Sequence, residues 1–160
     1  MIKIKRIDNR QNIENSVGVI RDSFRTVALE FGLNEGNCPT HPSLITLDKL
    51  AVLEEKAKLF GLFLNDKQVG FVAVEKADGE VYYLDKLAVL PEYRHKGYGR
   101  YLVDFVVSYV KEQGGQKVSL GMINESTVLK NWYKKLGFSE TETKKFEHLP
   151  FTVCFMDMKV

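Results

Sequence analysis

Hydrophobic and polar residues follow one another along the chain in patterns that predict strands and helices in mixed order. Residues 2–7 alternate as in a strand, and apolar side chains recur at helical spacing from about Ile13 to Phe31, where Gly32 is a plausible stop. Residues 34–42 hold two prolines and a glycine, which indicates a loop. A second amphipathic helix is predicted for about residues 46–58.

The rest of the chain continues with short strands, turns and two more helices. Asp78-Gly79 is a strong hairpin signal, and Pro91, which cannot donate a ladder hydrogen bond, ends a long strand. The helices should cover about residues 98–113, before Gly114-Gly115, and 125–136, before Gly137. The predicted strands of this part are 60–64, 69–75, 81–90, 118–123 (read as buried on both sides), 138–146 and 152–158.

This order of elements predicts one α/β (α+β) domain over residues 1–160. Its mixed central sheet should have about seven strands and be flanked by about four helices. The chain contains no internal repeat, low-complexity tract or flexible linker that would divide it.

Composition and charge exclude several classes of protein. A hydrophobic share of 44% and a charged share of 28% are those of a soluble globular chain, and no apolar run is long enough to span a membrane. The net charge of +2 is too small to predict a nucleic-acid partner. Cys38 and Cys154 have no spacing typical of a metal site or disulfide framework, so we expect plain thiols in a cytoplasmic protein without a metal.

The most informative segment follows the strand that ends at Pro91. Gly97 and Gly99 open a helix, where backbone N–H groups and the helix dipole favour an anion, and Arg94, Lys96 and Arg100 concentrate positive charge there. The segment lacks the Gly-Lys-Ser/Thr ending of a P-loop and the third glycine of a dinucleotide-binding loop. Two readings stay open at this point, a phosphate-binding loop and a tight strand-to-helix turn.

Two sequence blocks resemble the GNAT superfamily of acetyl-CoA-dependent N-acetyltransferases. Residues 87–99 (LAVLPEYRHKGYG) match its strand and Arg/Gln-x-x-Gly-x-Gly/Ala motif, and residues 132–138 (WYKKLGF) look like its Tyr-x-x-x-Gly-Phe helix ending. The resemblance implies a GNAT-like domain whose sheet is splayed after the fourth strand. It also implies acetyl-CoA as the cofactor, coenzyme A as the product, and direct transfer of the acetyl group to a primary amine.

The resemblance places the cofactor on this loop and on the strand before it. The backbone of residues 87–89 would pair with the pantetheine arm, and the amides of residues 95–100 would hold the diphosphate. Many family members have an asparagine where this chain has Ser126, so Asn124 and Asn131 are carried only as possible contacts, and helix capping explains Asn124 almost as well. The expected cofactor-binding residues are Leu87, Ala88, Val89, Arg94, His95, Lys96, Gly97, Tyr98, Gly99, Arg100, Asn124 and Asn131.

Two residues are candidates for proton transfer. Tyr133 matches the family tyrosine often assigned to protonate the leaving thiolate, and the structural alternative is a core aromatic that packs under Phe138. Asp85 shares a face with Leu87 by strand alternation and could be the general base, or it could only pair with Lys86. Glu75, Glu147 and a chain of water molecules are the weaker alternatives for the base.

The amine acceptor should bind between two loops. By the resemblance these are residues 34–42 and 145–150, which supply Asn37, Cys38, His41 and His148 as candidate substrate-binding residues, although a loop histidine can also be a surface or capping group. A small amine is the expected acceptor and a homodimer is possible. The alternatives are an acyl-CoA sensor without turnover and an enzyme that acetylates proteins or peptides.

Overall fold

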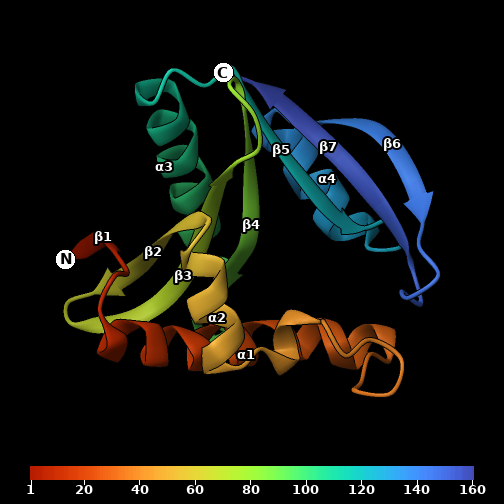
Figure 1. The fold of residues 1–160 in the computed structure, drawn as a ribbon, viewed down its shortest axis with the longest axis horizontal. Helices are drawn as coiled ribbons and strands as arrows, with labels where there is room; N and C mark the ends of the chain where they lie inside the picture. The colour runs from red at the N-terminus through yellow and green to blue at the C-terminus, as the bar shows by residue number, and fades with distance from the viewer.

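The computed structural model describes residues 1–160 as one seven-stranded sheet with helices on both of its faces (Figure 1). The predicted order of elements and the number of strands are confirmed. In spatial order the strands are β1 (Ile2–Arg6), β2 (Ala57–Leu64), β3 (Lys67–Lys76), β4 (Val81–Val89), β5 (Lys117–Ile123), β7 (Thr152–Lys159) and β6 (Ser139–Lys145). The helices are α1 (Arg10–Phe31), α2 (Leu47–Glu54), α3 (Tyr98–Glu112) and α4 (Thr127–Leu136), with short 3-10 turns η1 (Pro42–Leu44) and η2 (Pro91–Tyr93).

The sheet opens between its fourth and fifth strands. β4 and β5 form the only parallel pair, and their register covers only Val81–Tyr83 against Lys117–Ser119. β5 instead pairs with β7 along its whole length, so the two halves of the sheet diverge beyond Tyr83. Figure 1 shows the resulting V, with β1–β4 on one side and β5–β7 on the other. The predicted splay after the fourth strand is therefore confirmed.

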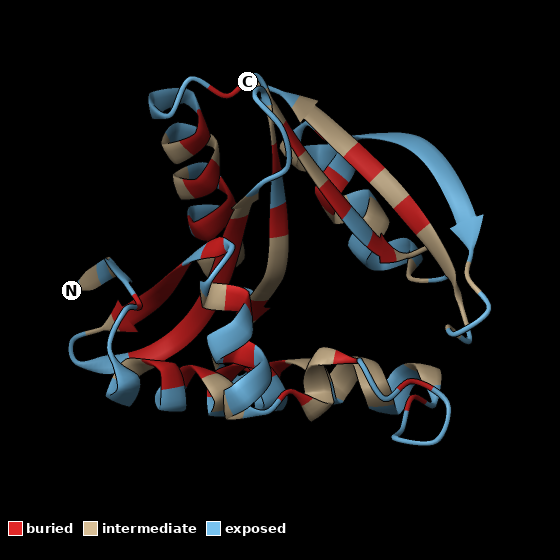
Figure 2. Ribbon diagram, viewed as in Figure 1, coloured by how far each residue is buried: buried red, intermediate tan, exposed pale blue.

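Burial differs strongly between the two halves. β2 and β3 are covered by helices on both faces and are almost wholly buried, whereas every residue of the edge strand β6 is exposed (Figure 2). α1 packs on β3 and β4 and α2 packs on β2, while α3 packs on β3 and β4 from the other side. The half that carries β1–β4 thus contains the most completely buried strands of the sheet.

Short-range signals set the ends of several elements correctly. Gly32 and Gly137 end α1 and α4 in the left-handed region, at φ 63° and 112°, as a helix C-terminus favours. The Asp78 carboxylate accepts hydrogen bonds from the amides of Glu80 and Val81, which fixes the predicted hairpin. α1 begins earlier than its apolar pattern because the side chain of Asn9 caps the amide of Asn12 at 2.9 Å.

Two sequence predictions are wrong. The second helix ends at Glu54 because residues from Ala57 pair with β3 as a strand, and ladder pairing outweighs the local helical pattern there. β5 is not buried on both sides, since its residues alternate and Gly121 is exposed where the strand borders the opening of the sheet. None of the helices combines the length and the apolar character needed to cross a membrane.

Candidate functional site

The loop between η2 and α3 is built to hold an anion. His95 and Gly97 both have left-handed backbones, at φ 63° and 85°, and alternation of this kind turns successive N–H groups toward one concave side. None of the six backbone N–H groups from His95 to Arg100 donates to another group of the protein. They lie at the start of the 15-residue helix α3, whose dipole adds partial positive charge.

Two exposed cations, Lys96 and Arg100, belong to the same segment as these free amides. Their side chains and that of His95 face solvent, and Lys96 Nζ lies 5.7 Å from the centre of the Tyr93 ring. Arg100 has only a loose contact with Asp104, at 3.9 Å, and its side chain is 70% exposed. Side-chain charge and backbone donors therefore occur in the same segment. This favours a phosphate-binding loop over a tight strand-to-helix turn without a ligand.

Arg94 does not add its charge to that group. Its guanidinium turns back to α1, where it donates to the Ser23 carbonyl at 2.6 Å and the Thr26 hydroxyl at 2.9 Å, and its Nε donates to the Val89 carbonyl at 3.1 Å. Burial lowers the pKa of Arg94, and the nearby Glu92 carboxylate offsets part of this. The expectation that the Arg94 side chain faces the anion is wrong, because the guanidinium joins α1 to the end of β4.

A bulge shapes the strand that leads to this loop. The register of β3 with β4 runs from Ala73 opposite Asp85 to Phe71 opposite Ala88, so Lys86 and Leu87 together fill the place opposite one β3 residue. Lys86 takes a left-handed backbone, at φ 54°. The predicted alternation that put Asp85 and Leu87 on one face is therefore wrong. Beyond Tyr83 the β4 edge that faces β5 is unpaired, which leaves the predicted strand contact open.

The two sequence blocks meet in space. A side chain at Gly99 would lie 3.1 Å from the Trp132 ring, so the start of α3 packs directly on α4. Trp132 and the next residue, Tyr133, have ring centres 5.0 Å apart, and Tyr133 in turn packs edge-on against Phe138 at 5.5 Å. This contact places the tyrosine beside the anion loop, although 34 residues separate Gly99 from Tyr133 in sequence.

Tyr133 is held in its protonated form. Its side chain is buried, and burial, followed by the negative charge of Asp85, raises the pKa of its hydroxyl well above the usual value. The hydroxyl makes no hydrogen bond to the protein, and it is not among the fully buried polar atoms that lack a partner, which are Ser23 Oγ and Gln68 Oε1. The ring is thus a core aromatic, and the role of the hydroxyl as a proton donor stays a prediction.

Asp85 lies half-buried at the point where the sheet opens. Lys86 Nζ lies 3.2 Å from its Oδ2, so the pairing predicted for it exists, and the carboxylate can still accept a proton from a second partner. The weaker candidates are placed differently. Glu75 pairs with Lys56 at 3.7 Å on the outer side of β3, and Glu147 is exposed in the loop after β6.

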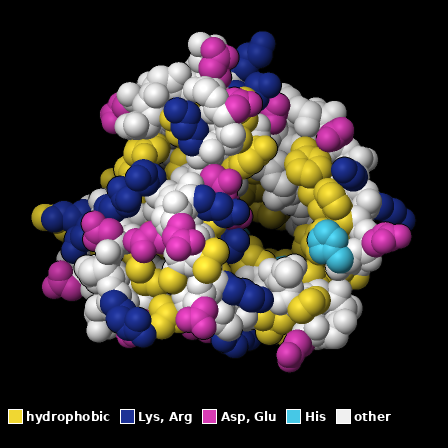
Figure 3. All heavy atoms as spheres, viewed as in Figure 1, with side chains coloured by type: hydrophobic (Ala, Val, Ile, Leu, Met, Phe, Trp, Pro, Cys, Tyr) yellow, Lys and Arg dark blue, Asp and Glu magenta, His cyan; other side chains and the backbone are white.

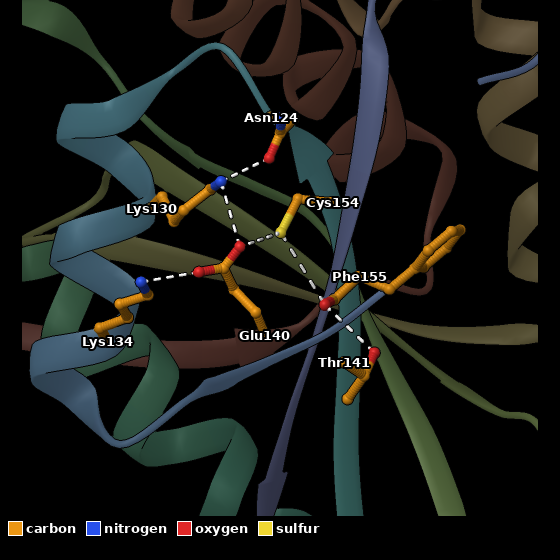
Figure 4. Close-up of polar contacts among 7 residues, drawn as sticks. All are labelled: Asn124, Lys130, Lys134, Glu140, Thr141, Cys154 and Phe155. Carbon is orange, nitrogen blue, oxygen red and sulfur yellow. Dashed lines mark hydrogen bonds and ion pairs between the residues drawn. The ribbon is translucent and has the colours of Figure 1, made fainter. Parts of the chain in front are cut away.

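Asn124 and Asn131 have different surroundings, and their contact with the cofactor stays a prediction. Asn131 is exposed on α4, and Asn124 does not cap that helix, because its side-chain oxygen accepts a hydrogen bond from Lys130. Figure 4 shows Lys130 reaching from Asn124 to Glu140, a carboxylate that Lys134 also binds at 2.7 Å. These ion pairs tie α4, which carries Tyr133, to β6. Nothing in the sequence singled out Glu140 as an ion-pair partner, because charged residues that alternate along an edge strand usually face solvent.

The expected acceptor residues have separate positions. Cys38 is 1% exposed and belongs to the core, so its prediction as a substrate contact is wrong. Asn37 ties its own loop together, through the Gly32 carbonyl at 2.9 Å and the Asn34 amide at 2.8 Å. His148 is exposed and packs on Phe146, whereas His41 is buried against Phe24. Figure 3 shows a hollow in this face of the molecule, with lysine or arginine side chains on one side and a histidine on another.

The three-way contact of Arg94 makes a stability prediction. Arg94→Gln should lower the free energy of unfolding by about 2 kcal/mol, because buried acceptors on α1 and β4 lose a charged donor. Urea denaturation measures this effect. Arg100→Gln, which removes the same charge from an exposed site, should change it by less than about 0.5 kcal/mol. Equal effects of the two changes would contradict the role assigned to Arg94.

The Glu140 ion pairs make a pH prediction. Hydrogen bonds from Lys134 and then Lys130 lower the pKa of Glu140 from 4.5 to about 2. A carboxyl whose pKa is depressed on folding adds stability above its unfolded pKa and loses it as pH falls through the folded value. Stability should therefore fall between about pH 4.5 and 2, and less steeply in Glu140→Gln, as followed by urea denaturation across that range. Glu142→Gln, on the same strand and without an ion pair, is the control and should keep the wild-type slope.

Comparison with known proteins agrees with the resemblance. The model of the acetyltransferase (GNAT) family matches residues 26–138. An uncharacterised N-acetyltransferase of Methanocaldococcus jannaschii is 34% identical over 90 residues, which cover 51% of this chain and 39% of that protein. The [ribosomal protein bS18]-alanine N-acetyltransferase of Haemophilus influenzae is 31% identical over 84 residues, 52% of this chain and 56% of that protein. The chain thus matches only about half the length of these curated relatives or less.

Solved structures match along nearly the whole chain. The PaiA N-acetyltransferase of Thermoplasma acidophilum, in complex with coenzyme A, has a TM-score of 0.82 at 19% identity and covers 100% of this chain and 99% of its own. The ribosomal-protein-S18-alanine N-acetyltransferase of Escherichia coli has a TM-score of 0.77 at 17% identity, covering 100% and 94%. These likenesses show the fold, and the family model adds the sequence match. The chain belongs to the GNAT acetyltransferase family.

Proposed function

We propose that the protein is an N-acetyltransferase that moves the acetyl group of acetyl-CoA to a primary amine. The observation that carries this proposal is that two features lie near each other: six free amides at the start of α3, and the hydroxyl of Tyr133, which is protonated and makes no hydrogen bond. Gly99 against Trp132 joins the two parts. The solved structures with coenzyme A or acetyl-CoA bound have the same fold, which supports the identity of the donor.

The chain's own residues fit the donor. The amides of residues 95–100 suit a diphosphate, because an anion there meets several convergent N–H groups and the positive end of a helix. The unpaired edge of β4 beyond Tyr83 offers N–H and C=O groups to an extended chain, in the manner of an added strand. When bound, acetyl-CoA supplies the acetyl group as a thioester.

Two side chains would transfer protons, one to the leaving thiolate and one from the attacking amine. The raised pKa of Tyr133 favours the protonated hydroxyl, which can donate to sulfur as negative charge develops there. Asp85, at the opening of the sheet, would accept the proton that the amine loses as it becomes an amide. Lys86 Nζ, 3.2 Å from Asp85 Oδ2, holds that carboxylate in place at the opening.

A second function has a specific observation in its favour. The matched proteins of Haemophilus influenzae and Escherichia coli are ribosomal-protein alanine N-acetyltransferases, so a protein N-terminus is the alternative acceptor. The loop of residues 145–150 is mostly exposed, so a peptide could approach it. The small amine stays the main proposal.

Release of free coenzyme A from acetyl-CoA tests the proposal. We expect release that depends on an added amine, measured against a panel of small amines and N-terminal peptides, and the class that supports turnover decides between the two acceptors. Binding of acetyl-CoA without release from any amine would instead make the protein a sensor.

Tyr133→Phe tests the proton donor. The change should lower kcat by about 100-fold and leave the Kd of acetyl-CoA unchanged, because the ring still packs while the acid is lost. Tyr109→Phe, which removes a hydroxyl at the far end of α3, is the matched control and should keep the wild-type rate. A wild-type kcat in Tyr133→Phe would remove the hydroxyl from the mechanism.

A further inference from the structure

A recess of about 230 Å³ lies between α2 and β4, beside the point where the sheet opens. We call it the lysine recess, after Lys49, Lys56 and Lys86 in its wall. Lys49 lies on α2, and Lys56 follows two residues after the end of that helix. Lys86 comes from the bulge of β4. The wall contains no carboxylate.

The charges of the lysine recess are not balanced. Lys56 has a partner in Glu75 at 3.7 Å and Lys86 has one in Asp85 at 3.2 Å, but both carboxylates lie outside the wall. Lys49 is exposed and belongs to no ion pair. The three ammonium groups outnumber their two carboxylate partners, so the recess keeps a net positive charge that a bound anion would balance.

His41 adds a neutral donor to the same wall. The backbone N–H of Ser43 can only donate, and it lies 3.3 Å from Nδ1 of His41, so Nδ1 is the acceptor. Burial lowers the pKa of His41, which keeps the ring neutral with its proton on Nε2. The polar groups of the wall therefore offer mainly hydrogen-bond donors, as a carboxylate or phosphate requires.

The lysine recess adjoins the proposed site of proton transfer. Lys86 follows Asp85 in the chain, and their charged ends touch. Asp85 itself lies two residues beyond Tyr83, the last residue of β4 that pairs with β5. A small molecule with its amine at Asp85 would thus place a nearby anionic group among the lysines.

We propose that the lysine recess binds the anionic group of the acceptor, which makes the acceptor a small amine that also bears a carboxylate or a phosphate. This inference rests on the proposed function for the fate of the amine, but the binding of the anion does not depend on turnover. Polyamines and other purely cationic amines would be repelled.

Matched amines test the proposal through release of coenzyme A. β-Alanine is compared with its amide, and phosphoethanolamine with ethanolamine, so that the two sources of the anion are separated. We expect the anionic member of at least one pair to have the lower KM, by about tenfold. Equal KM values within both pairs, or a preference for spermidine, would overturn the proposal and leave acetyl transfer standing.

A double variant locates the effect. Lys49→Gln with Lys56→Gln should raise the KM of the preferred anionic amine by about tenfold, with kcat and the Kd of acetyl-CoA within about twofold. Lys111→Gln with Lys159→Gln removes the same charge from exposed sites away from the recess. This control should leave the KM of the amine, kcat and the Kd of acetyl-CoA unchanged. If both double variants weaken the amine equally, net charge and not the recess is responsible.

Phosphate binding tests the recess even without turnover. Titration of inorganic phosphate, followed by NMR of the His41 ring and the lysine ammonium groups, should shift His41, Lys49 and Lys86 together in the wild type. The shifts should be lost in the Lys49→Gln, Lys56→Gln variant and kept in the control variant. Absence of these shifts in the wild type overturns the proposal, whereas absence of release with every amine overturns only the proposed function.

Discussion

The pairing between β4 and β5 ends after three residues, and the opening that this leaves in the sheet determines where the candidate site lies. Only three residues of each strand are in register, after which β5 follows β7 and β4 follows β3. Backbone groups along the free edge of β4 must then find partners outside the sheet, because unpaired polar groups are costly to bury. An open V between two well-paired half-sheets therefore presents hydrogen-bonding groups, and β4 carries its bulge at Lys86 and Leu87 beyond the last paired residue.

One contact joins the two halves of the V, and others brace each half separately. The ring of Trp132 lies on the glycine backbone at the start of α3, so the anion loop and the buried Tyr133 share one wall. Behind the loop, Arg94 joins α1 to the end of β4 through three hydrogen bonds. Lys130 and Lys134 tie α4 to β6 in a similar way (Figure 4). The site is thus positioned by side chains that do not take part in its chemistry.

Charge divides the site into two regions with different chemistry. Around the start of α3, free amides and exposed cations suit a phosphate-bearing donor. On the other side of the sheet opening, Asp85 stands between the tyrosine, whose pKa it helps to raise, and the lysine recess, whose nearest ammonium it contacts. A carboxylate in that position can receive a proton from an amine while the lysines hold the remainder of the same small molecule.

The sequence by itself determined the features that short-range chemistry controls. Asp78-Gly79 formed the predicted hairpin, Gly32 and Gly137 ended their helices, and residues 95–100 formed a helix start with unpaired amides, because turn torsions and helix ends depend on neighbouring residues. Tertiary structure alone decided where α2 ends, since β2 gains its partner from β3. It also decided that Arg94 turns to α1, that Cys38 is buried and that three lysines line one recess. Each of these depends on residues brought together only by folding.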